Sequence, residues 1–263
     1  MIAGIFHQGS GLGNQLARYV FTRCLALDKG FEFGMVNPHL FKGAGFLNID
    51  MGKTAEGLIH LYEEKRVNNE NGVDIRGYDF EGILNIKDNT RVDGELQGEK
   101  YYEHHKDEIR EWLNVEPFDF PIPFAEPENV CVLAFRGGEY VGVPDLFLPK
   151  EYWYNAMENM RKFNPKIKFG VVTDDIATAQ EFFPNFPIRH EIGEDWRSIR
   201  SAHNLILSNS SFGILPAWLG NAKHIISPWG WARYNLGFWA MQQNKIKGWH
   251  YQRKDGSLEL LYG

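Results

Sequence analysis

The sequence has few cysteines and no long apolar run. Cys24 and Cys131 are the two cysteines among 263 residues, and both lie in apolar stretches. A disulfide framework is therefore excluded, and two buried free thiols are expected. No stretch approaches the roughly 18 consecutive apolar residues of a membrane-spanning helix. The N-terminus lacks the charged and apolar regions of a secretory signal. We therefore expect a protein of the reducing cytoplasm.

The sequence also lacks a basic region and a metal-binding motif. The formal net charge is −6, acidic and basic residues alternate, and no basic stretch contains interleaved aromatics. A nucleic-acid partner is therefore not expected. No group of cysteines or histidines has metal-ligand spacing. The pair His104-His105 stands among charged residues and is interpreted as part of a solvated helix face. No metal and no bound cofactor are predicted.

The N-terminal half begins with a strand, a glycine loop and a helix. Residues 2–6 form a short apolar run, glycines follow at alternate positions, and apolar residues then recur at helical spacing with Asn14 as the expected N-cap. Residues 35–98 are weakly periodic and predict short strands and long loops. A second amphipathic helix is expected over 102–113. The prolines between Pro117 and Pro127 indicate a linker.

The C-terminal half alternates between strand and helix patterns. Strands are predicted over 130–135, 167–173, 205–208 and 224–227, the last being the final strand. Helices are predicted after Pro149, over 176–183, around Trp196 to His203, and over 211–219. Tryptophans 229, 231, 239 and 249 are expected mostly in the core. This alternation predicts an α/β fold with a parallel sheet.

Polar residues follow the predicted strands at equivalent positions. Arg136-Gly137-Gly138-Glu139 follows the first strand of the C-terminal half, Thr173-Asp174-Asp175 ends the second, and Ser208 to Ser211 ends the third. Ligands of open α/β sheets bind beyond the carboxyl ends of the strands. An arginine, hydroxyls and helix N-terminal amides suit a nucleotide diphosphate, and a carboxylate suits a base or a ribose.

Each of these signals has an ordinary structural alternative. The glycines can form a tight turn, and their spacing is not that of a complete dinucleotide-binding motif. Arg136 can be an ion-pair partner. Asp174 and Asp175 can cap the next helix or hold a divalent ion, and Ser208 to Ser211 can be only an N-cap.

Five blocks in this order resemble glycosyltransferase family 11, the α-1,2-fucosyltransferase-like proteins, and more loosely the wider α-1,2/α-1,6/O-fucosyltransferase group. The blocks are Gly11-Leu12-Gly13-Asn14-Gln15-Leu16, Leu96 to Tyr102, Arg136 to Tyr140, Thr173-Asp174-Asp175, and His203 to Phe212 with Ala217-Trp218-Leu219. The last block is the longest match, and together the blocks span nearly the whole chain.

The resemblance implies two Rossmann-like subdomains of the GT-B type. Residues 1–125 would form the acceptor side with the glycine loop, and residues 126–263 would bind the donor nucleotide on a parallel sheet with helices on both faces. The glycine loop is expected to face the phosphates across a cleft. The implied activity is an inverting, metal-independent transfer of L-fucose from GDP-fucose to a hydroxyl of a carbohydrate acceptor.

The expected site residues combine the resemblance with the strand-end positions. The donor-binding residues would be Gly11, Gly13, Asn14, Gln15, Arg136, Asp174, Asp175, Asn209, Ser210, Ser211 and Phe212. The catalytic residues would be Arg136, which the wider group uses on the donor phosphates, and Glu139 and Asp145, the acids nearest the arginine loop and the candidates for a general base.

The chain also departs from the family. The family's His-x-Arg-Arg-Gly-Asp-Tyr motif has its histidine at Ala134, its second arginine at Gly137 and its aspartate at Glu139, and a Ser-Trp-Trp becomes Gly213-Ile214-Leu215. The missing histidine lies near the base in relatives. A transferase with another sugar-nucleotide donor, a non-catalytic sugar or nucleotide-sugar binding protein, and an NAD-type oxidoreductase suggested by the glycine loop therefore stay as alternatives.

Overall fold

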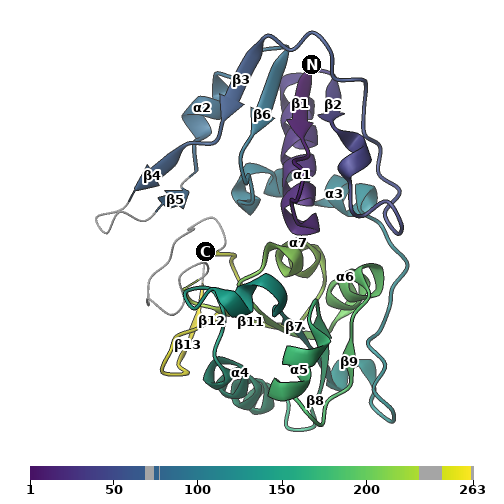
Figure 1. Ribbon diagram of the computed structural model, residues 1–263, viewed down its shortest axis with the longest axis vertical. Coiled ribbons are helices and arrows are strands. Elements are labelled where there is room, and N and C mark those ends of the chain that lie inside the picture. Colours follow the sequence, from purple (N-terminus) through teal and green to yellow (C-terminus); the bar gives the residue numbers. More distant parts are fainter. Residues whose placement is uncertain (69–73, 77, 231–244, 262–263) are drawn as a thin grey trace. The chain divides into compact units, whose positions relative to one another are not determined.

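The computed structural model describes residues 1–263 except 69–73, 77, 231–244 and 262–263 (Figure 1). The chain divides into two compact units, one with Met1–Val115 and the other with the described residues from Glu116 onward. The boundary predicted from the prolines, between residues 125 and 126, falls within the second of these units. Both units combine helices with parallel strands, which confirms the predicted α/β class.

The N-terminal unit is built on a four-stranded parallel sheet with the strand order β2-β1-β6-β3. Its strands are β1 (Ile2–Ile5), β2 (Phe33–Val36), β3 (His60–Glu63) and β6 (Thr90–Asp93). Its helices are α1 (Leu12–Lys29), α2 (Phe80–Leu84) and α3 (Lys106–Trp112), with 3-10 turns η1 (Pro38–Leu40), η2 (Glu99–Tyr101) and η3 (Glu103–His105). Strands β4 (Arg66–Asn68) and β5 (Asp74–Arg76) form a separate antiparallel pair.

Helix α1 packs closely on β1 because of a small residue in the strand. A Cβ added at Gly4 would lie 2.4 Å from the Thr22 hydroxyl oxygen, so only glycine permits this approach. The N-cap of α1 is Gly11, with no side-chain cap. The prediction of Asn14 as the N-cap is therefore wrong: Asn14 is the third residue of the helix, where its side chain no longer faces the free amides. Leu27, expected on the buried face, is 53% exposed.

Helix α1 ends in a Schellman motif. Gly30 adopts a φ of 66°, its N–H donates to the Leu27 carbonyl, and the Phe31 N–H donates to the Ala26 carbonyl. A left-handed residue after the last helical residue is most easily a glycine. This motif fixes the direction in which the last turn of α1, including Asp28, presents its side chains.

The C-terminal unit is built on a seven-stranded sheet with the strand order β13-β12-β11-β10-β7-β8-β9. The strands are β7 (Val130–Phe135), β8 (Lys168–Thr173), β9 (Ile188–Arg189), β10 (Asn204–Leu207), β11 (His224–Pro228), β12 (His250–Gln252) and β13 (Leu258–Leu260). The helices are α4 (Lys150–Phe163), α5 (Ile176–Phe182), α6 (Ile192–Ser201) and α7 (Ser211–Leu219), with 3-10 turns η4 (Pro127–Asn129) and η5 (Gly138–Gly142).

Helices lie on both faces of this sheet. Alternate residues of β7 point to opposite faces, and Cys131, Leu133 and Phe135 join a cluster with buried residues of α4 and α5. On the other face, Gly213 of α7 lies near Ala134 and Leu207, and α6 contacts α7. The apolar face predicted for α4 is confirmed, since Trp153, Ala156, Met157 and Met160 are all buried.

Several predictions for single elements are wrong. Tyr102 precedes the 3-10 turn of residues 103–105, so only Lys106–Trp112 is α-helical in the predicted 102–113 helix. His203 follows α6 and lies outside it. Strand β11 is not the last, because β12 and β13 follow, and β13 runs antiparallel to β12, so the sheet is not wholly parallel.

The predictions for the cysteines, the tryptophans and membrane-spanning helices can be compared directly with the structure. Both cysteines are free and buried, as expected. Trp249 is buried and Trp229 is half-buried, while Trp231 and Trp239 lie outside the described residues. None of the described helices is long and apolar enough to cross a membrane.

The aromatic cluster around Phe135 yields a stability prediction. Phe135 is 3% exposed, and its ring centroid lies 5.1 Å from that of Phe182 and 5.3 Å from that of Trp153. Truncation to alanine leaves a cavity in a layer that cannot collapse easily. We expect Phe135→Ala to lower the free energy of unfolding by about 3–5 kcal/mol in urea denaturation. Phe124→Ala is the matched control, because Phe124 is fully exposed in the same unit, and it should change stability by less than about 0.5 kcal/mol. Equal losses for the two variants would contradict this packing.

Candidate functional site

The chain reverses its direction across the C-terminal sheet between β7 and β10. From β7 the chain passes through α4 to β8 and then to β9 on one side, whereas from β10 it passes through α7 to β11 and β12 on the other side. The two strands are paired in parallel, with Ala134 opposite Leu207. Loops that leave two such strands diverge to opposite faces, and ligands of α/β sheets bind at this switch point. The residues that follow β7 and β10 are therefore the candidates for a site.

Arg136 is the first residue after β7, and two carboxylates hold it. Its Nη1 lies 2.7 Å from Asp174 Oδ2 and its Nη2 lies 2.9 Å from Glu139 Oε1. The guanidinium carbon lies 5.2 Å from the centre of the Tyr140 ring. Its buried Nε has no hydrogen-bond partner among the described residues. The side chain of Arg136 is 27% exposed and that of Glu139 is 75% exposed. The Glu139 contact is therefore a solvated ion pair that contributes little to stability and can exchange.

The two glycines after Arg136 let the β8 carboxylates approach the backbone. Gly137 N–H donates to Asp174 at 2.9 Å, and Gly138 N–H donates to Asp175 at 3.3 Å. A Cβ at Gly138 would lie 2.4 Å from Asp174 Oδ2, and its φ of +43° disfavours other residues. Phe135 pairs with Thr173, so the two strands end side by side and bring these loops together. A Cβ at Gly137 would lie 2.7 Å from the Asp175 Cβ, so the glycine that stands where the resembled family has its second arginine has a local steric reason.

Asp175 is the N-cap of α5. Its carboxylate accepts hydrogen bonds from the Thr178 N–H at 3.1 Å and the Thr178 hydroxyl at 2.6 Å. The Thr178 hydroxyl, followed by the backbone N–H groups, holds the pKa of Asp175 below its ordinary value. Asp175 is therefore a helix cap, which is the ordinary structural alternative that the sequence left open for it. Asp174 is instead the ion-pair partner of Arg136.

The segment after β10 places a helix N-terminus beside the arginine loop. Ser208 continues the β7–β10 ladder through its N–H to the Ala134 carbonyl at 3.1 Å. Ser210 is the N-cap of α7, and its side chain accepts from the Phe212 N–H. No acidic residue stands in the first turn of α7, so its partial positive charge is not compensated from within the helix. Free amides at such an end bind anions.

Asn209 links this segment to the arginine loop. It is 3% exposed, its Nδ2 donates to the Leu146 carbonyl at 2.8 Å, and its Oδ1 has no partner among the described residues. Asp145, which precedes Leu146, is half-buried in the same loop. The segments that leave β7, β8 and β10 thus contain these of the predicted residues: Arg136, Glu139, Asp145, Asp174, Asp175, Asn209, Ser210, and Ser211 and Phe212 as the first two residues of α7.

The N-terminal unit has a polar edge of its own at an equivalent position. The chain passes from β1 to β2 on one side, and β6 lies on the other side of β1. His7 Nε2 and the Asp93 carboxylate join the two loops at 2.8 Å and 3.0 Å. Arg18 joins them again, donating to Ser10 Oγ at 3.0 Å and to the Gly94 carbonyl at 2.5 Å.

The sequence prediction missed His7, Asp93 and Arg18. His7 directly follows a predicted strand, which is the signal that singled out Arg136. Asp93 comes from the weakly periodic stretch, in which no strand end was identified.

The glycine-loop residues predicted to bind the donor begin α1. Gly11 is its N-cap and Gly13 is buried in its first turn. Asn14 Oδ1 accepts from Gln97 Nε2 at 2.9 Å. Gln15 is fully buried, donates to the Leu40 carbonyl at 2.7 Å and accepts from the Lys42 N–H at 2.9 Å, so both ends of its amide hold the loop near η1. Binding of the donor by these residues stays a prediction.

A cavity in the C-terminal unit lies away from these residues. It has a volume of about 150 Å³ and is lined by Phe120, Pro121, Pro127, Val130 and Val132 among others. Val130 is the first residue of β7, so this cavity lies at the amino end of the strand, opposite Arg136. It is also smaller than the ~300–1,000 Å³ of typical ligand pockets. We therefore assign it no role in the site.

Comparison with known proteins adds a limited finding. The chain is similar to the solved structure of the E. coli heptosyltransferase WaaC with ADP, with 12% sequence identity, 88% of each chain covered and a TM-score of 0.43. No protein-family model matches the chain, and no curated protein matches it. The likeness is to a glycosyltransferase, and it gives no support to fucose or GDP-fucose as the donor.

The cap on α5 predicts a pH-dependent stability. Because the pKa of Asp175 is lower in the folded state, its contribution is complete above the ordinary carboxyl pKa and is lost as the pH falls through the lower folded value. We expect Asp175→Ala to reduce the free energy of unfolding by about 1 kcal/mol near neutral pH. The difference from wild type should shrink in acid. Urea unfolding at both pH values measures this, with the exposed Asp119→Ala as control. A difference that grows in acid would show that the carboxylate does not act as the cap.

Proposed function

We propose that the protein is a glycosyltransferase that binds a sugar nucleotide at the carboxyl edge of the C-terminal sheet and transfers the sugar to an acceptor hydroxyl. The observation that carries the proposal is that Arg136 and the N-terminus of α7 follow two adjacent parallel strands, β7 and β10, at the switch point of the sheet. A guanidinium and the positive end of a helix dipole on adjacent segments are groups that bind a diphosphate. The resemblance to the fucosyltransferase-like proteins supports the same assignment for Arg136.

The ion pairs of Arg136 are compatible with phosphate binding. Asp174 also accepts the Gly137 N–H, so it is fixed on the backbone and orients one edge of the guanidinium. Glu139 is mostly exposed and makes only one hydrogen bond to the other edge. A phosphate oxygen carries charge and accepts bidentate hydrogen bonds, so it competes well for this edge. Donor binding would then displace Glu139 and leave its carboxylate available.

The reaction would be an inverting displacement. The acceptor oxygen forms a bond to the anomeric carbon while the bond between that carbon and the diphosphate oxygen breaks. Negative charge develops on the departing diphosphate, where Arg136 and the first-turn amides of α7 would stabilise it most strongly. The acceptor proton would pass to a carboxylate, for which Glu139 and Asp145 are the candidates. Positioned bases of this kind contribute about 10²–10⁴-fold.

The donor and the metal requirement belong to the proposal as well. GDP-fucose is the donor that the resemblance favours, but Ala134 and Gly137 replace family residues near the base and the arginine loop. Another nucleoside diphosphate sugar is the alternative that these replacements suggest. Because a guanidinium and helix amides serve the diphosphate, we propose that transfer needs no divalent ion.

Substitution of Arg136 tests the proposal. We expect Arg136→Ala to lower kcat for donor transfer or hydrolysis by about 100- to 1,000-fold, as for loss of one transition-state donor. Arg136→Lys should rescue little, because lysine lacks the bidentate fork. The matched control is Arg161→Ala, which removes a half-buried arginine of α4 that pairs with Glu158 and lies over the Phe169 ring, outside the proposed site.

The assay compares GDP-, UDP- and ADP-sugars in EDTA, with thermal unfolding as a measure of folding. Near-normal turnover of a folded Arg136→Ala protein would overturn the role of Arg136. Wild-type activity that is lost in EDTA and restored by Mn²⁺ would show that the diphosphate is held by a metal, with Asp174 as the first ligand to consider.

A further inference from the structure

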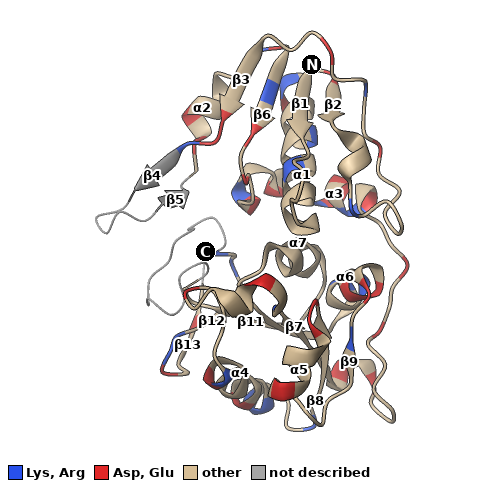
Figure 2. Cartoon of the chain, in the orientation of Figure 1, with Lys and Arg blue, Asp and Glu red and all other residues tan. Residues whose placement is uncertain are grey.

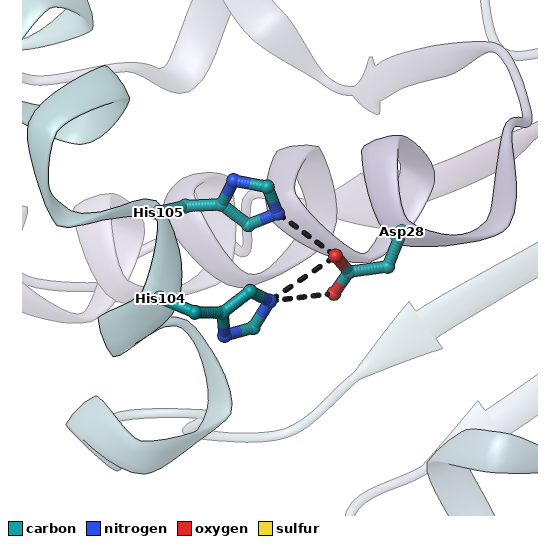
Figure 3. Close-up of side chains that lie close together, drawn as sticks. All are labelled: Asp28, His104 and His105. Atoms are coloured by element: carbon teal, nitrogen blue, oxygen red, sulfur yellow. Dashed lines mark hydrogen bonds and ion pairs between the residues drawn. The ribbon is translucent and has the colours of Figure 1, made fainter.

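Two histidines and an aspartate converge on the surface of the N-terminal unit. His105 Nε2 lies 2.8 Å from Asp28 Oδ1, and His104 Nε2 lies 3.1 Å from both Asp28 carboxylate oxygens. Asp28 lies in the last turn of α1 and the histidines lie in η3, 76 and 77 residues further along the chain. Both imidazole rings point their Nε2 edge at the same carboxylate (Figure 3). The pair lies on a largely solvated surface, as the sequence interpretation has it, but in a 3-10 turn and in contact with Asp28.

The convergence brings three potential metal ligands together. Two neutral imidazoles can each donate an Nε2–H to Asp28, since a carboxylate accepts about four hydrogen bonds. In the other tautomer both Nε2 lone pairs and a carboxylate oxygen face one point, which is the arrangement that a metal ion requires. Here adjacent residues, with ring centroids 4.4 Å apart, direct equivalent nitrogens at one oxygen. If both rings carried protons, two cations would lie side by side on a largely exposed surface. If neither Nε2 carried a proton, three electron-pair donors would face one another without an electrophile.

We propose that Asp28, His104 and His105 form a binding site for Zn²⁺. One ligand atom from each residue lies within 4.8 Å of the other two. Zinc binds imidazole nitrogens and carboxylate oxygens at about 2.0–2.2 Å, so the ligand atoms of a tetrahedral site are about 3.3 Å apart by this geometry. The observed separations of 2.8 Å and 3.1 Å are close to that value. Water would complete the fourth position, because the His104 and Asp28 side chains are 52% and 39% exposed.

A fourth residue supports this ligand set. Glu108 Oε1 lies 3.2 Å from His105 Nδ1, on the ring nitrogen opposite the proposed ion. Metal-bound histidines usually donate this second N–H to a carboxylate, which fixes the tautomer and leaves the other nitrogen for the metal. Two imidazoles exclude Mg²⁺ and Ca²⁺ as the preferred ions, since both favour oxygen ligands. The Schellman motif at Gly30 holds Asp28 in place, so the ion would join the end of α1 to the η3–α3 segment.

This site is independent of the proposed transfer reaction. It lies wholly within the N-terminal unit, among residues that the sugar-nucleotide site does not use. Zinc binding would displace any protons from both Nε2 atoms, and its effect would be on stability. It therefore does not conflict with transfer in EDTA.

Zinc titration of the full chain tests the site. After EDTA treatment and desalting, isothermal titration with ZnCl₂ should show one site per chain, and zinc should raise the thermal unfolding temperature. His104→Gln and Asp28→Asn should each weaken zinc binding by about tenfold or more and remove the temperature shift. Glu108→Gln should weaken binding by about tenfold through loss of the supporting carboxylate. His39→Gln and His60→Gln are matched controls, because both histidines are exposed in the same unit, and they should bind zinc as the wild type does.

The outcomes separate the alternatives clearly. Absence of one-to-one binding, or binding that His104→Gln and Asp28→Asn leave unchanged, would overturn the proposal. His104 is largely exposed, so His104→Gln should fold even where His105→Gln does not. Cobalt provides a second readout, since Co²⁺ bound by this set should give the absorption of a tetrahedral site. An octahedral spectrum that is the same in wild type and His104→Gln would mean adventitious binding only.

Discussion

The parallel pairing of β7 with β10 is the constraint on which the candidate site depends. These strands are distant in sequence, yet their pairing makes the chain leave them toward opposite sides of the sheet. Their buried faces are apolar, and every residue of both strands is buried. Polar groups can therefore appear only where the strands end, and the same register, continued past the strand ends, places Arg136 level with Asn209. The position of the polar groups at the carboxyl edge of the sheet therefore follows from the packing of the buried strands.

The loops at this edge combine structural and binding groups. Asp175 caps α5, Asp174 holds Arg136 and the Gly137 N–H, and Asn209 holds the neighbouring loop through the Leu146 carbonyl. Two buried polar atoms at this edge of the sheet have no hydrogen-bond partner among the described residues, Arg136 Nε and Asn209 Oδ1, and the positive end of the α7 dipole lies on the neighbouring segment. Acidic and basic residues are otherwise interspersed along both units (Figure 2). The anion site is thus a local arrangement in an acidic protein.

Elements with strong local signals could be predicted from the sequence. Strand β7 is a continuous apolar run, α4 has a regular apolar face after Pro149, and α7 lies between Ser210 and Gly220, which stop it at both ends. Strands β12 and β13 are only three residues each and lack a periodic pattern, so they were missed. Asn14 misled because it is a good capping residue, whereas the helix already begins at Leu12, after Gly11.

The candidate site residues divide in the same way: those with a local sequence signal could be predicted, and those that join distant segments could not. Arg136, Asp174 and Ser210 were found because each directly follows a recognisable strand. The His7–Asp93 pair and the Asp28–His104–His105 set join segments far apart in sequence, and no local pattern specifies such contacts. Only the tertiary fold brings them together. The structure also assigns Gln15 a role in holding its loop, which the glycine pattern alone did not suggest.

A crystal structure of the protein with GDP tests the central claim most directly. The account predicts that diphosphate oxygens accept hydrogen bonds from the Arg136 guanidinium and from the first-turn amides of α7, with Glu139 displaced and Asp174 still in contact with Arg136. A nucleotide bound away from the switch point between β7 and β10, with Arg136 still held by both carboxylates, would contradict it.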